Sequence, residues 1–282
     1  MTLREWHQLT WEEIGALPAQ GMDAAILPVG ATEQHGPHMG CGIDAEIAQR
    51  VCHAVAGVTG AVLLPTLPYG CSIGHSQRWP GTLALQPKTL IDVVKDIGDW
   101  VYISGFRRLF IVNSHVTNFA PLRCALEMLR GQYDDLQVAL IDTPSISPRV
   151  REQHFHDADD WHANAAETSL MLAVAPHMIR PERIAGADDP DRTESCVFSH
   201  PVNRTSSNGV TGQPSLASRE KGEELFAWMV EDLSGLVERG MREQPPLPHS
   251  YFRSKGHLQN ESPLPSGEGQ GEGIKEIKTV PY

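Results

Sequence analysis

Four short runs of consecutive apolar residues stand out along the chain, and helical periodicity follows each of them. Each run has the length of a strand, and its apolar residues are contiguous rather than alternating. That pattern is typical of strands buried on both faces of a parallel sheet. The four predicted strands are Ala24–Val29, Ala61–Pro65, Leu109–Val112 and Val138–Ile141.

The segments between and after these runs place apolar residues three or four positions apart, on one face of a helix. A proline opens one segment and a glycine closes two of them, as is common at helix ends. We expect helices over Asp44–Ala56, Pro87–Ile103, Phe119–Arg130, Ala163–Ala175 and Leu216–Val237, with the tryptophan and the methionine of the last in the core. Alternating strands and helices predict an α/β fold, a three-layer α/β/α sandwich around a mainly parallel sheet.

The pattern also predicts the domain organisation. We expect residues 1–244 to form one globular domain, which contains two irregular stretches. Pro144–Trp161 is polar, and Ala185–Gln213 reads as a long loop or an arm that contacts another subunit. Residues 245–282 are rich in Pro, Gly, Ser and Glu, so we expect a flexible tail without a role in chemistry.

Composition narrows the class of protein. The 282 residues are 40% hydrophobic and 21% charged, which suffices for a large core. The net charge of −12, without a basic cluster, argues against nucleic-acid binding. No signal peptide is evident, and no apolar run approaches the ~18 residues of a membrane span. Five cysteines without a CxxC motif fit a reducing compartment, so we expect a cytoplasmic protein.

The loop after the first strand carries the most concentrated chemistry. Glu33 and His35 are two residues apart, so an extended backbone points both side chains the same way. Asp44 follows nine residues after His35. Carboxylate oxygens and imidazole nitrogens together suit zinc, manganese or iron. The loop therefore predicts part of a metal site, although a polar surface loop would show the same residues.

Other polar residues follow the ends of other strands. His115 follows the third strand and Asp142 the fourth, and ligands in parallel sheets bind beyond the carboxyl ends of strands. One tetrahedral ion needs fewer ligands than this chain offers, which are Glu33, His35, Asp44, His115 and Glu167. This set fits two ions that share a carboxylate, with a bridging hydroxide as the nucleophile. No Gly-x-Ser-x-Gly elbow and no glycine-rich phosphate loop is present.

Several histidines have two interpretations. His162 lies five residues before Glu167, about 140° around a helix, so the two face one site only if His162 precedes the helix. We expect His162 to shuttle a proton; the alternative is a structural helix cap. His38 either orients a ligand or packs in its turn, and His75 is a candidate substrate contact across a subunit boundary. We interpret His154, His156, Asp157 and Asp159 as a solvated loop.

The motif of residues 28–38, Pro-Val-Gly-Ala-Thr-Glu-Gln-His-Gly-Pro-His, closed by Asp44, resembles the signature of the creatininase (creatinine amidohydrolase) family. Further stretches agree in order and spacing: Tyr69-Gly70, His75, Trp79-Pro80-Gly81-Thr82, residues 113–118 (Asn-Ser-His-Val-Thr-Asn), residues 162–169 (His-Ala-Asn-Ala-Ala-Glu-Thr-Ser) and Gly209-Val210-Thr211-Gly212. The resemblance extends from about Pro18 to Val237.

The resemblance implies an α/β/α fold with two divalent transition-metal ions. Zinc is the first expectation, with manganese or iron as alternatives. The resemblance also implies assembly as a homo-oligomer, commonly a hexamer. Family members hydrolyse creatinine, a formylaminopyrimidine of archaeal flavin synthesis, or a modified peptide in mycofactocin maturation. Glu33, Asp44 and His115 would hold one ion. His35, Asp44 as the bridge, and a further carboxylate would hold the second.

The sequence departs from the family pattern after the third strand. Creatininase has a glutamate where this chain has Thr117, and that glutamate supplies the last ligand of the second ion. In this chain we expect Glu167 to replace that glutamate as the last ligand of the second ion, and we also predict a catalytic role for it. Val116 and Ser114 replace a tyrosine and a glycine, and Trp161 lies near the position of a substrate-binding tryptophan. We expect Thr117, Trp161 and His75 to contact a small-molecule substrate.

These observations predict a metal-dependent amidohydrolase that hydrolyses a non-peptide C–N bond of a small cyclic amide or formamide, as creatininase does. Two alternatives remain open at this point. One is a metallopeptidase of the mycofactocin-maturation type. The other is a non-catalytic family member that binds only a metal or a ligand, with Ser114 and Thr117 marking a degraded centre.

Overall fold

The computed structural model describes residues 2–247, 249 and 250. One compact unit ends at Pro246. Most of the predicted tail, residues 251–282, lies outside the described residues, so the expected flexibility of residues 245–282 stays a prediction. In the described part of the chain, no helix has the length and apolar character needed to cross a membrane.

The core of this unit is a sheet of four parallel strands in the order β2-β1-β3-β4. The strands are β1 (Ala24–Val29), β2 (Val62–Leu63), β3 (Arg108–Asn113) and β4 (Gln137–Asp142). The predicted parallel sheet is confirmed. Strand β2 is shorter than expected, because proline at position 65 has no N–H with which to continue the ladder.

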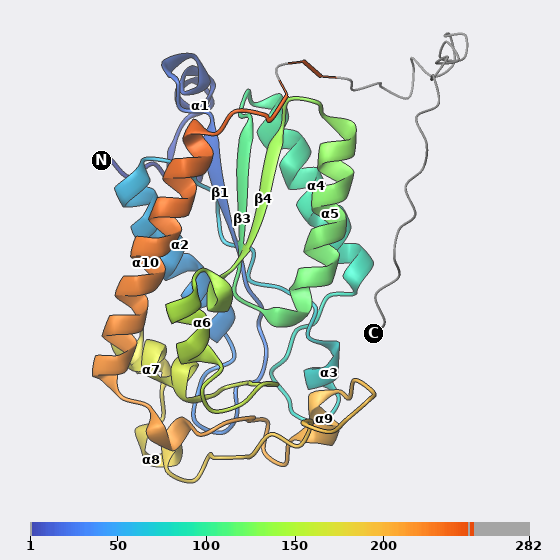
Figure 1. The fold of residues 1–282 in the computed structure, drawn as a ribbon, viewed down its shortest axis with the longest axis vertical. Helices are drawn as coiled ribbons and strands as arrows, with labels where there is room; N and C mark the ends of the chain where they lie inside the picture. Colours follow the sequence, from blue (N-terminus) through green and yellow to red (C-terminus); the bar gives the residue numbers. More distant parts are fainter. Residues whose placement is uncertain (1, 248, 251–282) are drawn as a thin grey trace, which may run out of the picture. The chain divides into compact units, whose positions relative to one another are not determined.

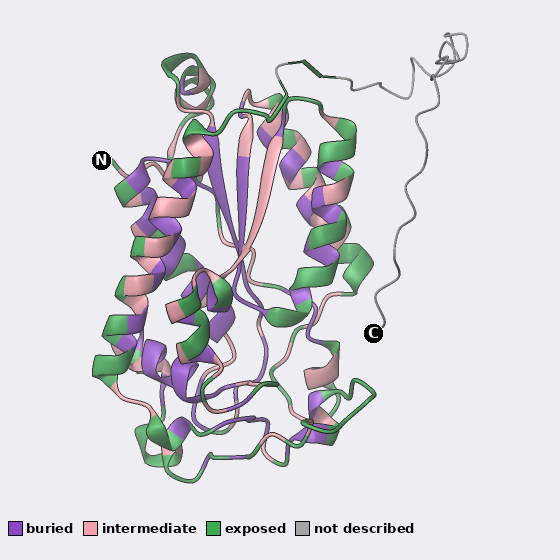
Figure 2. Ribbon diagram, viewed as in Figure 1, coloured by how far each residue is buried: buried purple, intermediate pink, exposed green. Residues whose placement is uncertain are grey.

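Helices cover both faces of the sheet, which gives the three predicted layers (Figure 1). In β1, Ala24 and Ile26 pack on one side with α2 (Ile43–Thr59), α7 (Ala165–Val174) and α10 (Arg219–Arg242). Ala25 and Leu27 pack on the other side with α4 (Pro87–Ile103) and α5 (Phe119–Gln132). Strand β1 is buried throughout, whereas the edge strand β4 is half-buried (Figure 2).

All five predicted helices are present; α4 has the predicted bounds, and the other four are shifted at one or both ends. The last begins after the cap Ser218 rather than at Leu216, and its Met229 is buried in the core as expected. Short helices complete the described unit: α1 (Trp11–Ala16), α3 (Ile73–Ser76), α6 (Pro148–His154), α8 (Pro181–Ile184) and α9 (Val202–Thr205), with 3-10 turns Trp6–Gln8, Pro18–Gln20, Val116–Asn118, Thr143–Ser145, Pro176–Met178 and Pro214–Leu216.

The prediction of an irregular, solvated stretch from Pro144 to Trp161 was wrong in two respects. Helix α6 forms there, because Ser147 caps it through Val150 N–H and a proline occupies its first turn. His154 is 2% exposed, and the carboxylate of Asp157 is 1% exposed. Asp157 accepts hydrogen bonds from the side chain of Asn164 and from the N–H groups of Ala165 and Gln213. The other two residues of that group, His156 and Asp159, are exposed.

Helices α7 and α10 cross so closely that only a glycine fits between them. A Cβ added at Gly222 would lie 1.8 Å from the carbonyl oxygen of Ser169. We expect Gly222→Ala to destabilise the protein by about 1–3 kcal/mol, because the backbones must move apart. On the same helix, Gly235 has only the flexible Arg239 side chain near it, at 3.6 Å.

The matched variant Gly235→Ala is therefore expected to stabilise α10 by about 0.5–1 kcal/mol, since alanine favours the helix. Urea unfolding of both variants checks the prediction. Equal unfolding midpoints for Gly222→Ala and the unmodified chain would show that the helices tolerate the methyl group.

Candidate metal centre

Five titratable side chains from separate parts of the chain meet at the carboxyl ends of β1 and β3. Glu33 and His35 come from the loop after β1, and Asp44 from the first turn of α2. His115 follows β3, and Glu167 lies in the first turn of α7. All five are at most 4% exposed. The structure thus brings together the whole predicted ligand set.

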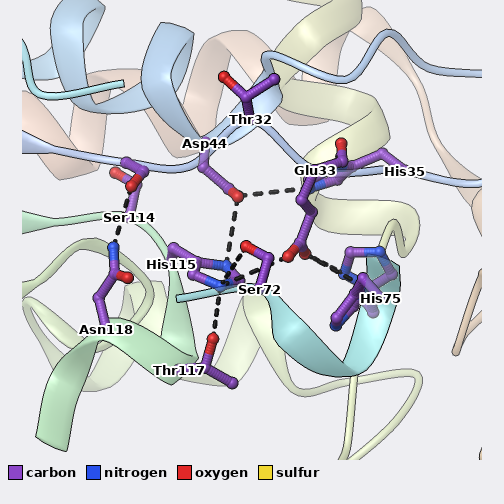
Figure 3. Close-up of polar contacts among 12 residues, drawn as sticks. Thr32, Glu33, His35, Asp44, Ser72, His75, Ser114, His115, Thr117 and Asn118 are labelled. Carbon is purple, nitrogen blue, oxygen red and sulfur yellow. Dashed lines mark hydrogen bonds and ion pairs between the residues drawn. The ribbon is translucent and has the colours of Figure 1, made fainter. Parts of the chain in front are cut away.

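Asp44 lies at the middle of this cluster (Figure 3). Its Oδ1 is 3.3 Å from His35 Nε2, and its Oδ2 is 3.3 Å from His115 Nδ1. Glu33 Oε2 is 3.4 Å from His115 Nε2, and Glu167 Oε1 is 3.7 Å from His35 Nε2. One carboxylate therefore faces two imidazoles, and each imidazole faces a second carboxylate.

The tautomer of His35 follows from its backbone contact. Its Nδ1 lies 3.0 Å from the carbonyl oxygen of Glu33, which can only accept, so Nδ1 carries the hydrogen. Nε2 is then the nitrogen with a lone pair, and it faces Asp44 and Glu167. A backbone carbonyl that fixes the ring in this way is common beside metal-binding histidines.

His115 is oriented by Thr117. The Thr117 hydroxyl donates to the carbonyl oxygen of Cys71 and therefore accepts from His115 Nε2, which also lies 3.1 Å from Ser72 Oγ. The Nδ1 of His115 is left as the nitrogen that faces Asp44. Thr117, predicted to contact substrate, thus uses its hydroxyl in hydrogen bonds to the Cys71 carbonyl and to His115. It also lines the cavity.

The polar atoms at the centre fit metal ions. Both Glu33 oxygens, His35 Nε2, Asp44 Oδ2 and Glu167 Oε2 are buried and have no hydrogen-bond partner. Leaving such groups unsatisfied is costly, and a metal ion would satisfy them. Two sets of buried donors have the compactness of a metal site, and Asp44 belongs to both: Glu33 with Asp44 and His115, and His35 with Asp44 and Glu167. A third set joins Glu33, His35 and His162.

The electrostatics of the cluster also favour cations. Burial by itself would lower the pKa of His115, but Glu33 and Asp44 raise it to about 9. Burial raises the pKa of Glu33 to about 7, with Asp44 adding to the effect and His115 opposing it. Burial would also raise the pKa of Asp44, but His35 and His115 hold it below its usual range. The cluster therefore attracts positive charge, whether protons or metal ions.

His162 and Glu167 face the same cavity because the chain bends sharply between them. His162 pairs with Thr211 through two backbone hydrogen bonds, outside α7. Ala163 then adopts a left-handed conformation (φ 52°), unusual for alanine, and Asn164 caps the helix through Glu167 N–H. This confirms that His162 precedes the helix. Its Nδ1 lies 3.3 Å from Glu33 Oε1.

All members of the cluster except His35 line a cavity of about 150 Å³. His75, Trp161 and Thr117 also line it, and their contact with a substrate stays a prediction. His38 does not line it; His38 Nε2 lies 2.9 Å from the hydroxyl of Thr168, the neighbour of Glu167. Asp142 instead accepts a hydrogen bond from Asn113. The polar lining residues to which the sequence assigned no role are Ser72, Asp160, His200 and Thr211. Thr211 alone had a signal, its place in a family motif.

Comparison with known proteins agrees with this geometry. The family model described as creatinine amidohydrolase matches residues 7–237. The creatinine amidohydrolase of Pseudomonas putida is 33% identical over 82% of this chain and 94% of that protein. The mycofactocin precursor peptide peptidase of Mycobacterium tuberculosis is 29% identical over 77% of this chain and 85% of that protein.

A solved structure of a mutant creatininase of the Zn-Zn type superposes with a TM-score of 0.74. It is 32% identical, and the match covers 86% of this chain and all of that chain. The layered fold, the family match and these relatives lead to one conclusion. The chain belongs to the creatininase (creatinine amidohydrolase) family of hydrolases.

Proposed function

We propose that this protein is a metal-dependent amidohydrolase that opens a small cyclic amide or removes a formyl group from a small formamide. The observation that carries the proposal is the pair of buried donor sets sharing Asp44 at the wall of the cavity. Glu33 and His115 would complete the site of one ion, and His35 and Glu167 that of the other. Zinc is the first choice, with manganese or iron as alternatives.

Two such ions, when bound, supply Lewis acidity: they polarise a carbonyl and make water a nucleophile near neutral pH. The chain's own residues supply the proton transfer. Burial lowers the pKa of His162 to about 4, so its imidazole is neutral and can accept a proton at Nδ1 beside Glu33. The same imidazole can return that proton to the leaving nitrogen. Trp161 offers an apolar wall to the substrate.

A small substrate is the first choice because the creatinine amidohydrolase relative is 33% identical, against 29% for the mycofactocin peptidase. The cavity of about 150 Å³ has room for a small ring beside Trp161. The mycofactocin peptidase relative keeps a metallopeptidase as the second candidate. A non-catalytic protein is disfavoured, because four of the five predicted ligands and His162 line one cavity, with the fifth ligand, His35, beside Asp44.

The test is a substrate panel on zinc-loaded protein. Creatinine, cyclic ureas, hydantoins, lactams and formamides are each assayed for hydrolysis, beside a short peptide. We expect turnover of a ring compound or a formamide, complete loss after chelation and recovery when zinc is returned. Hydrolysis of the peptide alone would favour the metallopeptidase. Protein that retains no metal, or activity that survives removal of metal, would refute the proposal.

The proposal includes assembly as a homo-oligomer, six subunits by resemblance to the family, in the cytoplasm. The five cysteines are free thiols, which suits a reducing compartment. Large apolar side chains are exposed on the described unit, including Trp11, Trp100, Val197 and Phe198, and subunit contacts would cover some of them. Light scattering of the purified protein measures the number of subunits directly.

A further inference from the structure

Gln34 lies between two predicted metal ligands, and its side chain is buried with a defined orientation. Its Oε1 accepts a hydrogen bond from Gly36 N–H at 2.9 Å, and its Nε2 donates to the carbonyl oxygen of Gly209 at 3.1 Å. An N–H group can only donate and a carbonyl can only accept. The flipped amide would face donor with donor and acceptor with acceptor, so only this orientation is allowed.

The amide also contacts two imidazoles of the cavity. Its Nε2 lies 3.2 Å from His75 Nδ1 and 3.2 Å from His162 Nε2. His162 Nε2 in turn lies 2.8 Å from the backbone carbonyl oxygen of Gln34, so this nitrogen must carry a hydrogen. The second amide hydrogen of Gln34 then has one acceptor left, the lone pair of His75 Nδ1 at 3.2 Å. Glu33 Oε1 also lies near this nitrogen, but farther away, at 3.5 Å.

These contacts give the two imidazoles the same tautomer, with the hydrogen on Nε2, but different neighbours at Nδ1. His162 carries its hydrogen on Nε2 and keeps a lone pair on Nδ1, the atom 3.3 Å from Glu33 Oε1. His75 keeps its lone pair on Nδ1, where it accepts from Gln34, and so carries its hydrogen on Nε2. The rings are neighbours, with centroids 4.4 Å apart. One ring can accept a proton, and the other can donate a hydrogen bond.

Gly209 leaves room for this arrangement. It has a positive φ of 89°, and a Cβ there would lie 2.1 Å from Gln34 Oε1. A side chain at position 209 would displace the amide from the two histidines. The loop 209–212 therefore holds Gln34 on one side through the Gly209 carbonyl, and holds His162 on the other through Thr211.

We propose that Gln34 is a positioning residue that sets the tautomers of both histidines: a bare Nδ1 on His162, which takes up the proton, and an N–H at Nε2 of His75. The assignment of tautomers stands on the contacts alone. Its consequence for hydrolysis rests on the proposed function.

The direct test is long-range ¹H–¹⁵N correlation spectroscopy of zinc-loaded protein labelled with ¹⁵N-histidine, at a pH where free imidazole is neutral. Signals are assigned with the variants His75→Asn and His162→Asn. We expect the shift of a bare nitrogen for His75 Nδ1 and that of an N–H nitrogen for His162 Nε2. A hydrogen on His75 Nδ1, or a bare His162 Nε2, in the unmodified protein would overturn the proposal without any variant.

Gln34→Glu then tests the cause. The change keeps the shape and the acceptor for Gly36 but replaces the donor with a second acceptor, so His75 must move its hydrogen to Nδ1. We expect that change in the spectrum, a fall in kcat of about 10²-fold with KM little altered, and two zinc ions per chain as before. Unchanged tautomers in the variant would overturn the role of Gln34.

Gln132→Glu is the matched control. Gln132 is exposed at the end of α5, where it contacts Tyr133, and the same change of charge there leaves spectra and kcat unaltered. The two proposals fail separately in these experiments. If no compound of the panel is hydrolysed, the proposed function fails, while the histidine spectra still decide whether Gln34 sets the tautomers.

Discussion

Asp44→Ala is expected to remove both metal ions and to abolish hydrolysis. Asp44 belongs to both fully buried donor sets, and its two oxygens face His35 Nε2 and His115 Nδ1, each at 3.3 Å. No other carboxylate among the described residues joins these two sets. Elemental analysis should show zinc falling from two ions to fewer than one per chain. Activity should fall at least about 10³-fold, since Lewis-acid stabilisation is worth several kcal/mol.

Asp142→Asn provides the control for this experiment. Asp142 ends β4 at the same edge of the sheet, but it contacts Asn113 rather than the donor sets. Asparagine keeps the acceptor for that contact, so this variant should hold two zinc ions. Two ions per chain in Asp44→Ala would show that the ions are held elsewhere, and would refute the shared-ligand arrangement.

The fold was predictable because its central strands, β1 and β3, are buried on both faces. A buried parallel strand must be apolar at every position, and β3 was found at Arg108–Asn113, one residue beyond the predicted run at each end. Helix α6 escaped prediction for the opposite reason. It has seven residues and only two of them are buried, too few to establish an apolar period. Its signal lay in the cap Ser147 and the proline that follows.

The candidate metal centre was predictable where its residues lie close to strand ends. Glu33 and His35 follow β1 directly, and His115 follows β3, so topology alone gathers them. Residues that act through distant partners could not be found in this way. Gln34 contacts Gly209, 175 positions away, and no local pattern shows that contact. His154 and Asp157 looked solvated for the same reason, since the groups that bury them come from other segments.

The other prediction with a large expected effect concerns the last ligand of the proposed second ion, the one beside His35 and Asp44. By the resemblance, creatininase itself has a glutamate where this chain has Thr117, and the structure offers Glu167 instead, 3.7 Å from His35 Nε2. Burial would raise the pKa of Glu167, but His35 lowers it, so the carboxylate is charged beside the imidazole. We expect Glu167→Gln to reduce bound zinc from two ions to one per chain. Hydrolysis should fall at least about 10²-fold, because one of the two Lewis acids is lost.

Thr117→Ala separates the two possible ligand positions. If Glu167 completes the second site, this variant keeps two zinc ions. The loss of the Thr117 hydroxyl then affects the protein only by changing the orientation of His115. Titration of the metal-free variants with zinc, followed by elemental analysis, measures both stoichiometries. Two ions in Glu167→Gln with one in Thr117→Ala would place the outer ligand after β3. The centre would then be completed by a hydroxyl, a far weaker ligand for a divalent ion than the buried carboxylate on α7.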